Sequence, residues 1–237
     1  LLQFSFRRDG SLRFAQENGR WGNFPSVLAG WRISNEDFWK RNINFINSFK
    51  WKASWGMLGN DRVDPFQYLA AYAINRGGIY DGSRAYEVSL IQNFIPNPAI
   101  TWEVSHSFNT GFEARFLQNK MFLNADFFYQ RRKNILVTRN ASVPNFTGLS
   151  LPDENFGIVD NRGFELELGF SDRKGDFSYN ISGNFAFARN KVVEFDEPAQ
   201  VVPWQVRTGR PQGGYLLYDG IGVFRDQEQI DKTPHVP

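Results

Sequence analysis

The chain has 237 residues, no cysteine, and 27 Lys and Arg against 25 Asp and Glu, which gives a formal net charge of +2. This near balance excludes a strongly basic nucleic-acid-binding protein, and the 41% of apolar residues excludes an acidic disordered chain. The absence of cysteine excludes disulfide frameworks, thiolate nucleophiles and zinc-thiolate sites.

Alternation of apolar and polar residues predicts strands along most of the chain, because successive side chains of a strand point to opposite faces. In chain order, we expect strands at 1–7, 22–33, 47–58, 101–117, 120–137, 161–171 and 176–189. In the fifth of these, Leu123, Ala125 and Phe127 form an apolar face, and Asn124 and Asp126 form a polar one. The predicted fold class is therefore all-β, with about seven antiparallel strands.

Strands with one apolar and one polar face occur in two architectures. In a soluble sandwich the apolar face meets a second sheet, whereas in an outer-membrane barrel it meets lipid and the polar face lines the lumen. Alternating runs of 10 residues or more favour the barrel, because soluble strands average about 5–6 residues and membrane strands need about 9–11. Aromatic residues near the strand ends also favour it, since such residues gather at membrane interfaces. They are Trp51, Trp55, Tyr129 and Tyr179.

The connections between the predicted strands alternate in length. Short turns are expected at 118–119 and 172–175, and the 34–46 connection is short to moderate. The longer, polar connections are 8–21, 59–100, 138–160 and the segment after 190. Outer-membrane barrels have short periplasmic turns and longer extracellular loops. We therefore expect an antiparallel transmembrane β-barrel segment, with 59–100, 138–160 and 190–237 outside the cell and the short turns in the periplasm.

A series of short motifs extends over nearly the whole chain. The first part contains Arg7-Arg8-Asp9-Gly10-Ser11, Trp21-Gly22-Asn23-Phe24-Pro25-Ser26, Gly30-Trp31-Arg32-Ile33-Ser34 and Ala53-Ser54-Trp55-Gly56. The rest contains Asn97-Pro98-Ala99-Ile100-Thr101-Trp102-Glu103, Asn109-Thr110-Gly111-Phe112-Glu113, Asn161-Arg162-Gly163-Phe164-Glu165 and Asp219-Gly220-Ile221-Gly222. In this order, the motifs resemble the barrel of SusC/RagA-like TonB-dependent transporters. Leu12 is a small departure, because the family often has a second Ser there.

The resemblance implies that residues 1–237 are part of one β-barrel domain, an arc of a larger plugged barrel in the outer membrane of a Gram-negative bacterium. Such barrels have about 22 strands. It also implies import of oligosaccharides or peptides, a SusD-like surface lipoprotein as partner, and energy from the TonB complex. The plug domain and the segment that contacts TonB fall outside the resemblance. The lipid bilayer is a further implied partner, whereas nucleic acid and cofactors are not implied.

Residues with catalytic or metal-binding chemistry are few. His106 and His235 are the two histidines, and neither lies in a metal or catalytic motif. Glu165 and Glu167 share one strand face, and we interpret them as charges on the hydrated side of a barrel rather than as a glycosidase pair. Three loop carboxylates lack the spacing of a calcium loop: Asp153, Glu154 and Asp160. We assign no catalytic, metal or cofactor site and expect no enzyme activity.

Substrate-binding residues are not assigned from the sequence. Aromatic residues in the predicted loops suit sugar rings or peptides, and they equally suit burial against a protein partner. They are Tyr68, Tyr72, Tyr80, Tyr86, Phe94, Phe146, Phe156, Trp204 and Tyr215. The alternative function is a soluble or secreted β-sandwich that binds carbohydrate through such aromatics. The chain begins with Leu1 and stops at Pro237 in a polar loop, so we expect it to be a segment of a longer polypeptide.

Overall fold

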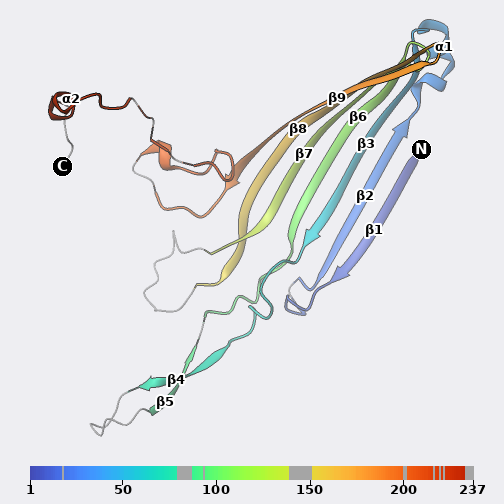
Figure 1. Ribbon diagram of the computed structural model, residues 1–237. Coiled ribbons are helices and arrows are strands. Elements are labelled where there is room, and N and C mark those ends of the chain that lie inside the picture. Colours follow the sequence, from blue (N-terminus) through green and yellow to red (C-terminus); the bar gives the residue numbers. More distant parts are fainter. Residues whose placement is uncertain are drawn as a thin grey trace.

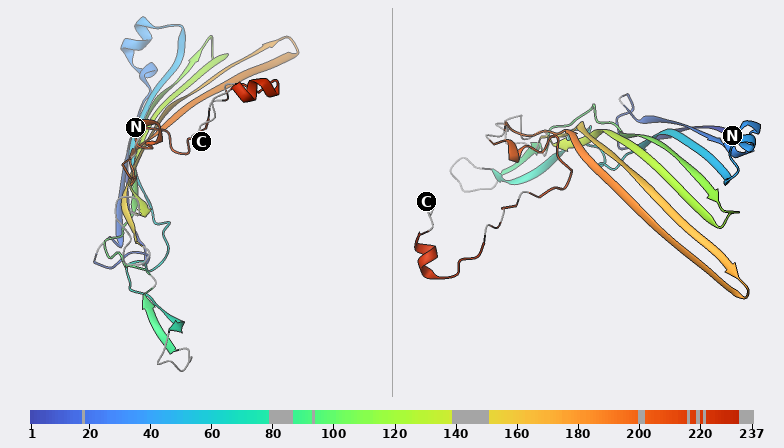
Figure 2. Two further views of the ribbon diagram at one scale, coloured as in Figure 1. Left: turned by 90° about the vertical axis from the view of Figure 1, so that its left-hand side faces the viewer. Right: turned by 90° about the horizontal axis from the view of Figure 1, so that it is seen from above.

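The computed structural model describes residues 1–17, 19–78, 87–92, 94–138, 151–199, 202–215, 217–218, 220 and 222–232. Its main element is a seven-stranded antiparallel sheet with the order β1-β2-β3-β6-β7-β8-β9. The strands are β1 (Leu2–Gly10), β2 (Trp21–Trp31), β3 (Ile46–Asn60), β6 (Glu103–Phe116), β7 (Met121–Thr138), β8 (Asp153–Lys174) and β9 (Phe177–Glu194). The predicted all-β, antiparallel fold is confirmed, and the sheet is twisted and open (Figures 1 and 2).

The smaller elements lie outside this sheet. Strands β4 (Tyr72–Gly78) and β5 (Glu87–Gln92) form an antiparallel pair within the β3–β6 connection. The 3-10 helix η1 (Ile33–Asn35) and helix α1 (Asp37–Asn42) lie between β2 and β3, whereas η2 (Pro203–Gln205) and α2 (Gln227–Lys232) follow β9. Among the residues described, every helix is too short or too polar to cross a membrane.

The two ends of the main sheet carry different kinds of connection (Figure 1). Residues 117–120 and 175–176 form tight turns at the end where α1 lies, which we call the turn end. The longer connections, 11–20, 61–102 and 139–152, and the segment after Glu194 begin at the opposite end, which we call the loop end. The predicted sorting is therefore confirmed for the turns 117–120 and 175–176, but not for 32–45, which lies at the turn end and is longer than 11–20.

Several bounds differ from the prediction. Strand β1 continues to Gly10 instead of residue 7, and β2 ends at Trp31 instead of residue 33. Strand β8 continues to Lys174, so most of the predicted turn 172–175 belongs to the strand and the turn is 175–176. Strand β8 begins at Asp153 instead of residue 161, because it continues to pair with β7 beyond a bulge near Asn134, whose φ is 58°. Strand β9 continues to Glu194 instead of residue 189. The predicted loop 59–100 contains the β4–β5 pair. Gly157 and the adjacent charges at the start of β8 interrupt the alternation, so the sequence signal for the strand is lost there.

The register of the main sheet separates an apolar face from a polar face. One cross-strand row on the apolar face contains Phe4, Val27, Trp55, Phe108 and Tyr129. Another contains Trp31, Trp51, Phe112, Ala125, Leu166 and Phe185. Many of these side chains are exposed: on this face Phe127 is 49% and Phe185 is 57% exposed. Within the described residues, no second sheet covers the face, as a sandwich would require.

A buried cluster at the loop end ties two long connections to β2. It contains Phe14, Phe24, Val63, Ile100 and Trp102, and the rings of Phe14 and Phe24 lie 5.3 and 5.4 Å from that of Trp102. A Cβ atom at Gly59 would lie 2.0 Å from the Phe24 ring. Glycine at this position of β3 therefore leaves the space that the Phe24 ring fills.

Candidate functional site

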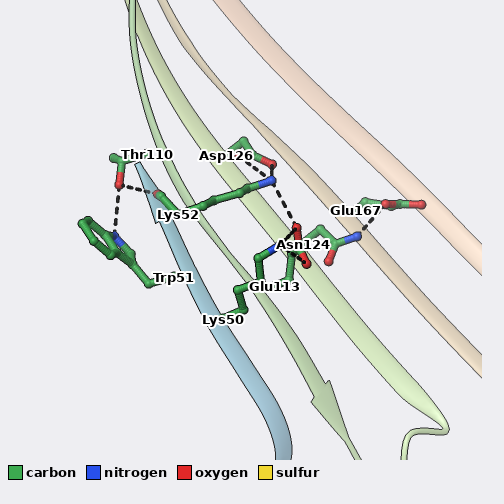
Figure 3. Close-up of polar contacts among 8 residues, drawn as sticks. All are labelled: Lys50, Trp51, Lys52, Thr110, Glu113, Asn124, Asp126 and Glu167. Carbon is green, nitrogen blue, oxygen red and sulfur yellow. Dashed lines mark hydrogen bonds and ion pairs between the residues drawn. The ribbon is translucent and has the colours of Figure 1, made fainter. Parts of the chain in front are cut away.

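A network of charged side chains crosses the polar face of β3, β6 and β7 (Figure 3). The Lys52 ammonium lies 3.0 Å from the Asp126 carboxylate and 3.6 Å from that of Glu113. Lys50 lies 3.4 Å from Glu113, which therefore contacts both cations. These side chains are 33–43% exposed, so each pair contributes only about 0.2–1 kcal/mol. The network is better suited to presenting charge than to holding the sheet together.

Gly111 makes room for the contact between Lys52 and Asp126. The register places Gly111 directly between these two residues, on the intervening strand β6. A Cβ atom at Gly111 would lie 2.4 Å from Asp126 Oδ1 and 2.3 Å from the carbonyl oxygen of Ala125. The absence of a side chain therefore allows the long Lys52 side chain to cross β6 and reach β7.

The network continues onto β8. Asn124 donates a hydrogen bond of 2.9 Å to Glu167, and Glu165 lies opposite Asp126 in the register. The two glutamates predicted on one strand face therefore do lie on the polar face beside the network. Arg32 and Arg115 line the same polar hollow as Lys50, Glu113, Asn124 and Glu167. The four carboxylates of Glu113, Asp126, Glu165 and Glu167 are therefore matched in number by Lys50, Lys52, Arg32 and Arg115. This patch presents charges of both signs, and it suits solutes and protein surfaces that offer hydrogen-bonding groups.

A second candidate is a cavity of about 830 Å³ at the loop end, between β7–β9 and the segment after β9. Its lining includes the buried side chains of Val137, Val159 and Val192. From the segment after β9 it includes two largely exposed aromatic residues and two basic ones: Trp204, Tyr215, Arg207 and Arg210. Apolar side chains beside aromatic rings and guanidinium groups suit a ligand that carries both apolar and hydrogen-bonding groups.

Backbone hydrogen bonds fix residues 209–212 of this segment against the end of β9. The N–H of Val192 donates to the Arg210 carbonyl oxygen at 2.8 Å, and the N–H of Gly209 donates to the Val192 carbonyl oxygen at 2.7 Å. The N–H of Gln212 donates to Asn190 Oδ1 at 2.6 Å. The segment after β9 therefore folds back onto the strand rather than leaving it directly.

Glu197 closes the turn that returns the chain to β9. Its carboxylate accepts hydrogen bonds from the backbone N–H groups of Arg207 at 2.8 Å and Thr208 at 3.0 Å. Burial raises the pKa of Glu197, but the hydrogen bonds from Thr208 and Arg207 and the charge of Arg207 outweigh it, so the pKa lies below its ordinary value. The ionised carboxylate is therefore the form that holds this turn.

The loop aromatics singled out in the sequence do not gather in one site. Trp204 and Tyr215 line the cavity, whereas Tyr68 packs on the buried cluster at the loop end. Tyr72 is 64% exposed on β4, and Phe94 and Phe156 do not line the cavity. The remaining three, Tyr80, Tyr86 and Phe146, lie outside the described residues.

The residues considered for catalysis are dispersed. The His106 ring lies 6.4 Å from the Trp55 ring on the apolar face. Asp160 accepts a hydrogen bond of 2.9 Å from the Tyr129 hydroxyl, and Asp153 accepts one from Thr138. In the part of the chain that the structure describes, no group of three or more His, Cys, Asp or Glu residues could hold a metal ion. His235 lies outside that part.

Residues 2–232 match the family model described as TonB dependent receptor-like, beta-barrel. The chain is 31% identical over 241 residues to TonB-dependent receptor P39 of Formosa agariphila, covering 99% of this chain and 22% of that protein. It is also 31% identical over 199 residues to TonB-dependent receptor SusC of Bacteroides thetaiotaomicron, covering 82% of this chain and 19% of that protein. The chain therefore spans about a fifth of the length of these relatives.

Solved structures of RagAB share the fold. The RagAB peptide importer in the closed-closed state superposes with a TM-score of 0.71 and 24% identity, covering 89% of this chain and 23% of that chain. The same importer in the open-open state gives a TM-score of 0.70 and 25% identity, covering 82% of this chain and 20% of that chain. This chain thus corresponds to about a fifth of the length of those chains.

Proposed function

Because the chain belongs to the TonB-dependent receptor-like β-barrel family, we propose that it forms one arc of the wall of a transporter that imports oligosaccharides or peptides. The family-level resemblance to SusC and RagA is confirmed, and the outer membrane of a Gram-negative bacterium is its location. The alternative, a carbohydrate-binding sandwich, would need a second sheet on the apolar face.

The separation of the two sheet faces is the observation that carries the proposal. Exposed apolar rows on one face suit contact with lipid, whereas the polar face with the Lys52–Asp126 network suits a hydrated lumen. This arrangement would destabilise a soluble protein. Burial of a large apolar side chain contributes roughly 1.5–3 kcal/mol to stability, and a side chain left in water does not make that contribution. In lipid the same side chains are favourable.

The partners and the domain plan are part of the proposal. Residues 1–237 would belong to one barrel domain, with the plug and the TonB-contacting segment elsewhere in the protein. The loop end would face outside the cell, where a SusD-like lipoprotein covers the barrel, and 190–237 would form part of that surface. Support comes from the cavity beside Trp204 and Tyr215, which lies at this end. The turn end would face the periplasm.

The chemical role we propose is transport without catalysis. The family is one of transporters and receptors. Three of the polar-face carboxylates are paired with a lysine or an amide: Glu113 and Asp126 contact Lys52, and Glu167 accepts a hydrogen bond from Asn124. Such pairing suits a hydrated wall that contacts a plug or a passing solute.

Uptake by cells tests the proposal directly. A strain that lacks the complete gene, and the same strain carrying the gene again, are given fluorescently labelled peptides and oligosaccharides in parallel. We expect accumulation of one class only in the complemented strain, and loss of that accumulation when TonB is also deleted. Equal accumulation with and without the gene for both classes would contradict the proposal. Accumulation that persists without TonB would contradict the energy source.

A further inference from the structure

The connection between β2 and β3 forms a compact aromatic and basic structure at the turn end. It comprises residues 32–45 and includes η1 and α1, and we call it the foot (Figure 1). The other described connections at this end, 117–120 and 175–176, are tight turns without a helix. A short strand-to-strand connection needs no helix, so the additional residues of the foot call for a physical explanation.

The foot packs against the apolar face of the sheet. The indole of Trp39 in α1 is stacked on the Phe49 ring of β3 at 5.1 Å, with an interplanar angle of 19°. Phe49 is in turn stacked on Phe112 of β6 at 5.5 Å. Both phenylalanines belong to the face that carries Trp51 and Trp55, because they lie an even number of residues from them or opposite them in the register. The foot is therefore continuous with the surface that meets lipid.

A second set of contacts fixes the foot to the end of β2. The Trp31 ring, also on the apolar face, meets the Phe38 ring edge-on at 6.4 Å. The Trp31 indole N–H donates a hydrogen bond of 2.9 Å to the Glu36 carboxylate. These contacts hold α1 beside Trp31, the last residue of β2, and its cross-strand partner Trp51. Tryptophans at the ends of membrane strands mark the boundary between acyl chains and headgroups.

The outer surface of the foot combines apolar side chains with a small excess of basic ones, because Arg32, Lys40 and Arg41 outnumber Glu36 and Asp37. Phe38 is 54% and Phe45 is 69% exposed. Lys40 and Arg41, in the last turn of α1, are exposed and make no ion pair within the described residues. Aromatic side chains enter the headgroup region readily, and the long stems of Lys and Arg let their charges reach lipid phosphates.

We propose that the foot is an interfacial anchor whose Phe38 and Phe45 insert at the acyl boundary of the inner leaflet while Lys40 and Arg41 bind the phosphates of anionic phospholipids. The assignment to the inner leaflet rests on the proposed function, because it places the turn end in the periplasm. The lipid contact itself rests on the continuity of the foot with the apolar face. The occupant is a phospholipid surface, since the charge of Lys40 and Arg41 matches its phosphates.

Photocrosslinking in the complete protein tests this assignment. Benzoylphenylalanine replaces Phe38, and the protein is reconstituted in nanodiscs of phosphatidylglycerol and phosphatidylcholine in equal amounts. After irradiation, mass spectrometry counts the adducts of each lipid. We expect lipid adducts at position 38, with phosphatidylglycerol preferred by roughly tenfold over phosphatidylcholine. The Lys40→Gln/Arg41→Gln variant should keep the adducts and lose most of the preference.

Matched controls separate the possible outcomes. The Arg62→Gln/Arg225→Gln variant removes two exposed cations outside the foot, and the preference should persist in it. Absence of lipid adducts at position 38, or an unchanged preference in the Lys40→Gln/Arg41→Gln variant, would overturn the proposal. In cells, adducts with lipopolysaccharide instead of phospholipid would overturn the assignment to the inner leaflet. Benzoylphenylalanine at position 127 tests the proposed barrel wall independently of the foot. Lipid adducts at 127 without adducts at 38 would contradict only the proposal for the foot, whereas absence of adducts at 127 would contradict the barrel wall.

Discussion

Replacement of Phe127 by arginine should impair assembly of the barrel, whereas replacement of Asp126 by asparagine should not. The two residues are adjacent on β7 and face opposite sides of the sheet. Phe127 is 49% exposed on the apolar face, and its ring lies 6.1 Å from that of Phe164. Asp126 lies on the polar face and pairs with Lys52. Because the two residues are adjacent, the comparison tests which face of the sheet meets lipid at a single depth in the membrane.

The magnitudes follow from these environments. A charge on the lipid face near the middle of the bilayer costs about 2–4 kcal/mol, and loss of the ring contact with Phe164 adds roughly 0.5–1.5 kcal/mol. Asp126→Asn removes one side of a half-exposed ion pair, worth about 0.2–1 kcal/mol, and Lys52 keeps Glu113 at 3.6 Å. Phe127→Arg should thus be several times as costly as Asp126→Asn.

Heat-modifiability measures this difference in the complete protein. Folded barrels migrate differently from heated ones in detergent gels, so the temperature at which the folded band disappears reports stability. We expect that temperature to fall, or the folded band to be lost, in Phe127→Arg, and to stay near the wild-type value in Asp126→Asn. Phe127→Leu is a control that keeps the face apolar. Wild-type behaviour of Phe127→Arg, or an equally large effect of Asp126→Asn, would refute the assignment of faces.

Three further predictions follow from single features. Gly111→Val should weaken the pairing of β6 with β7, because its Cβ would lie 2.3 Å from the Ala125 carbonyl oxygen; a folded-band temperature equal to that of wild type would contradict this. The turn held by Glu197 should loosen as the pH falls through the depressed pKa of this carboxyl, because a lowered folded-state pKa gives stability that is present at higher pH and lost in acid. Cleavage by pepsin beside Phe195 or Trp204, corrected for the activity of the protease at each pH, should therefore increase on acidification in wild type but be high and constant in Glu197→Gln; an equal pH response in both would argue against this role. In intact cells, protease should cleave within 61–102 and spare 175–176, and cleavage at 175–176 would reverse the proposed topology.

Much of the fold was predictable because strand alternation is a local signal. Once Leu123, Ala125 and Phe127 share a face, neighbouring strands must match that face in the register, and the structure confirms this. The start of β8 was not predictable, because the bulge near Asn134 changes which residues pair and Gly157 interrupts the pattern.

The candidate sites were less accessible to sequence reasoning. The contact between Lys52 and Asp126 joins residues from strands that are not adjacent, and it depends on the missing side chain of Gly111 between them. The alternation of residues along each strand places Lys52, Gly111 and Asp126 on the polar face. Only the pairing register of the strands brings them into one cross-strand row. The cavity wall depends on the return of the chain to Val192, which no short motif signals. The aromatic contacts of the foot likewise join two elements, α1 and β3.

The most direct test of the barrel wall is a nitroxide scan along β7 in the complete protein in lipid. Single labels are placed at each position from 123 to 127, and collisions with membrane-soluble oxygen and with a water-soluble nickel complex are measured. We predict that labels at Leu123, Ala125 and Phe127 collide with oxygen, and that labels at Asn124 and Asp126 collide with nickel or are shielded from both reagents by the plug. An oxygen pattern shifted by one residue, or no preferential access to oxygen at any of the five positions, would contradict the account.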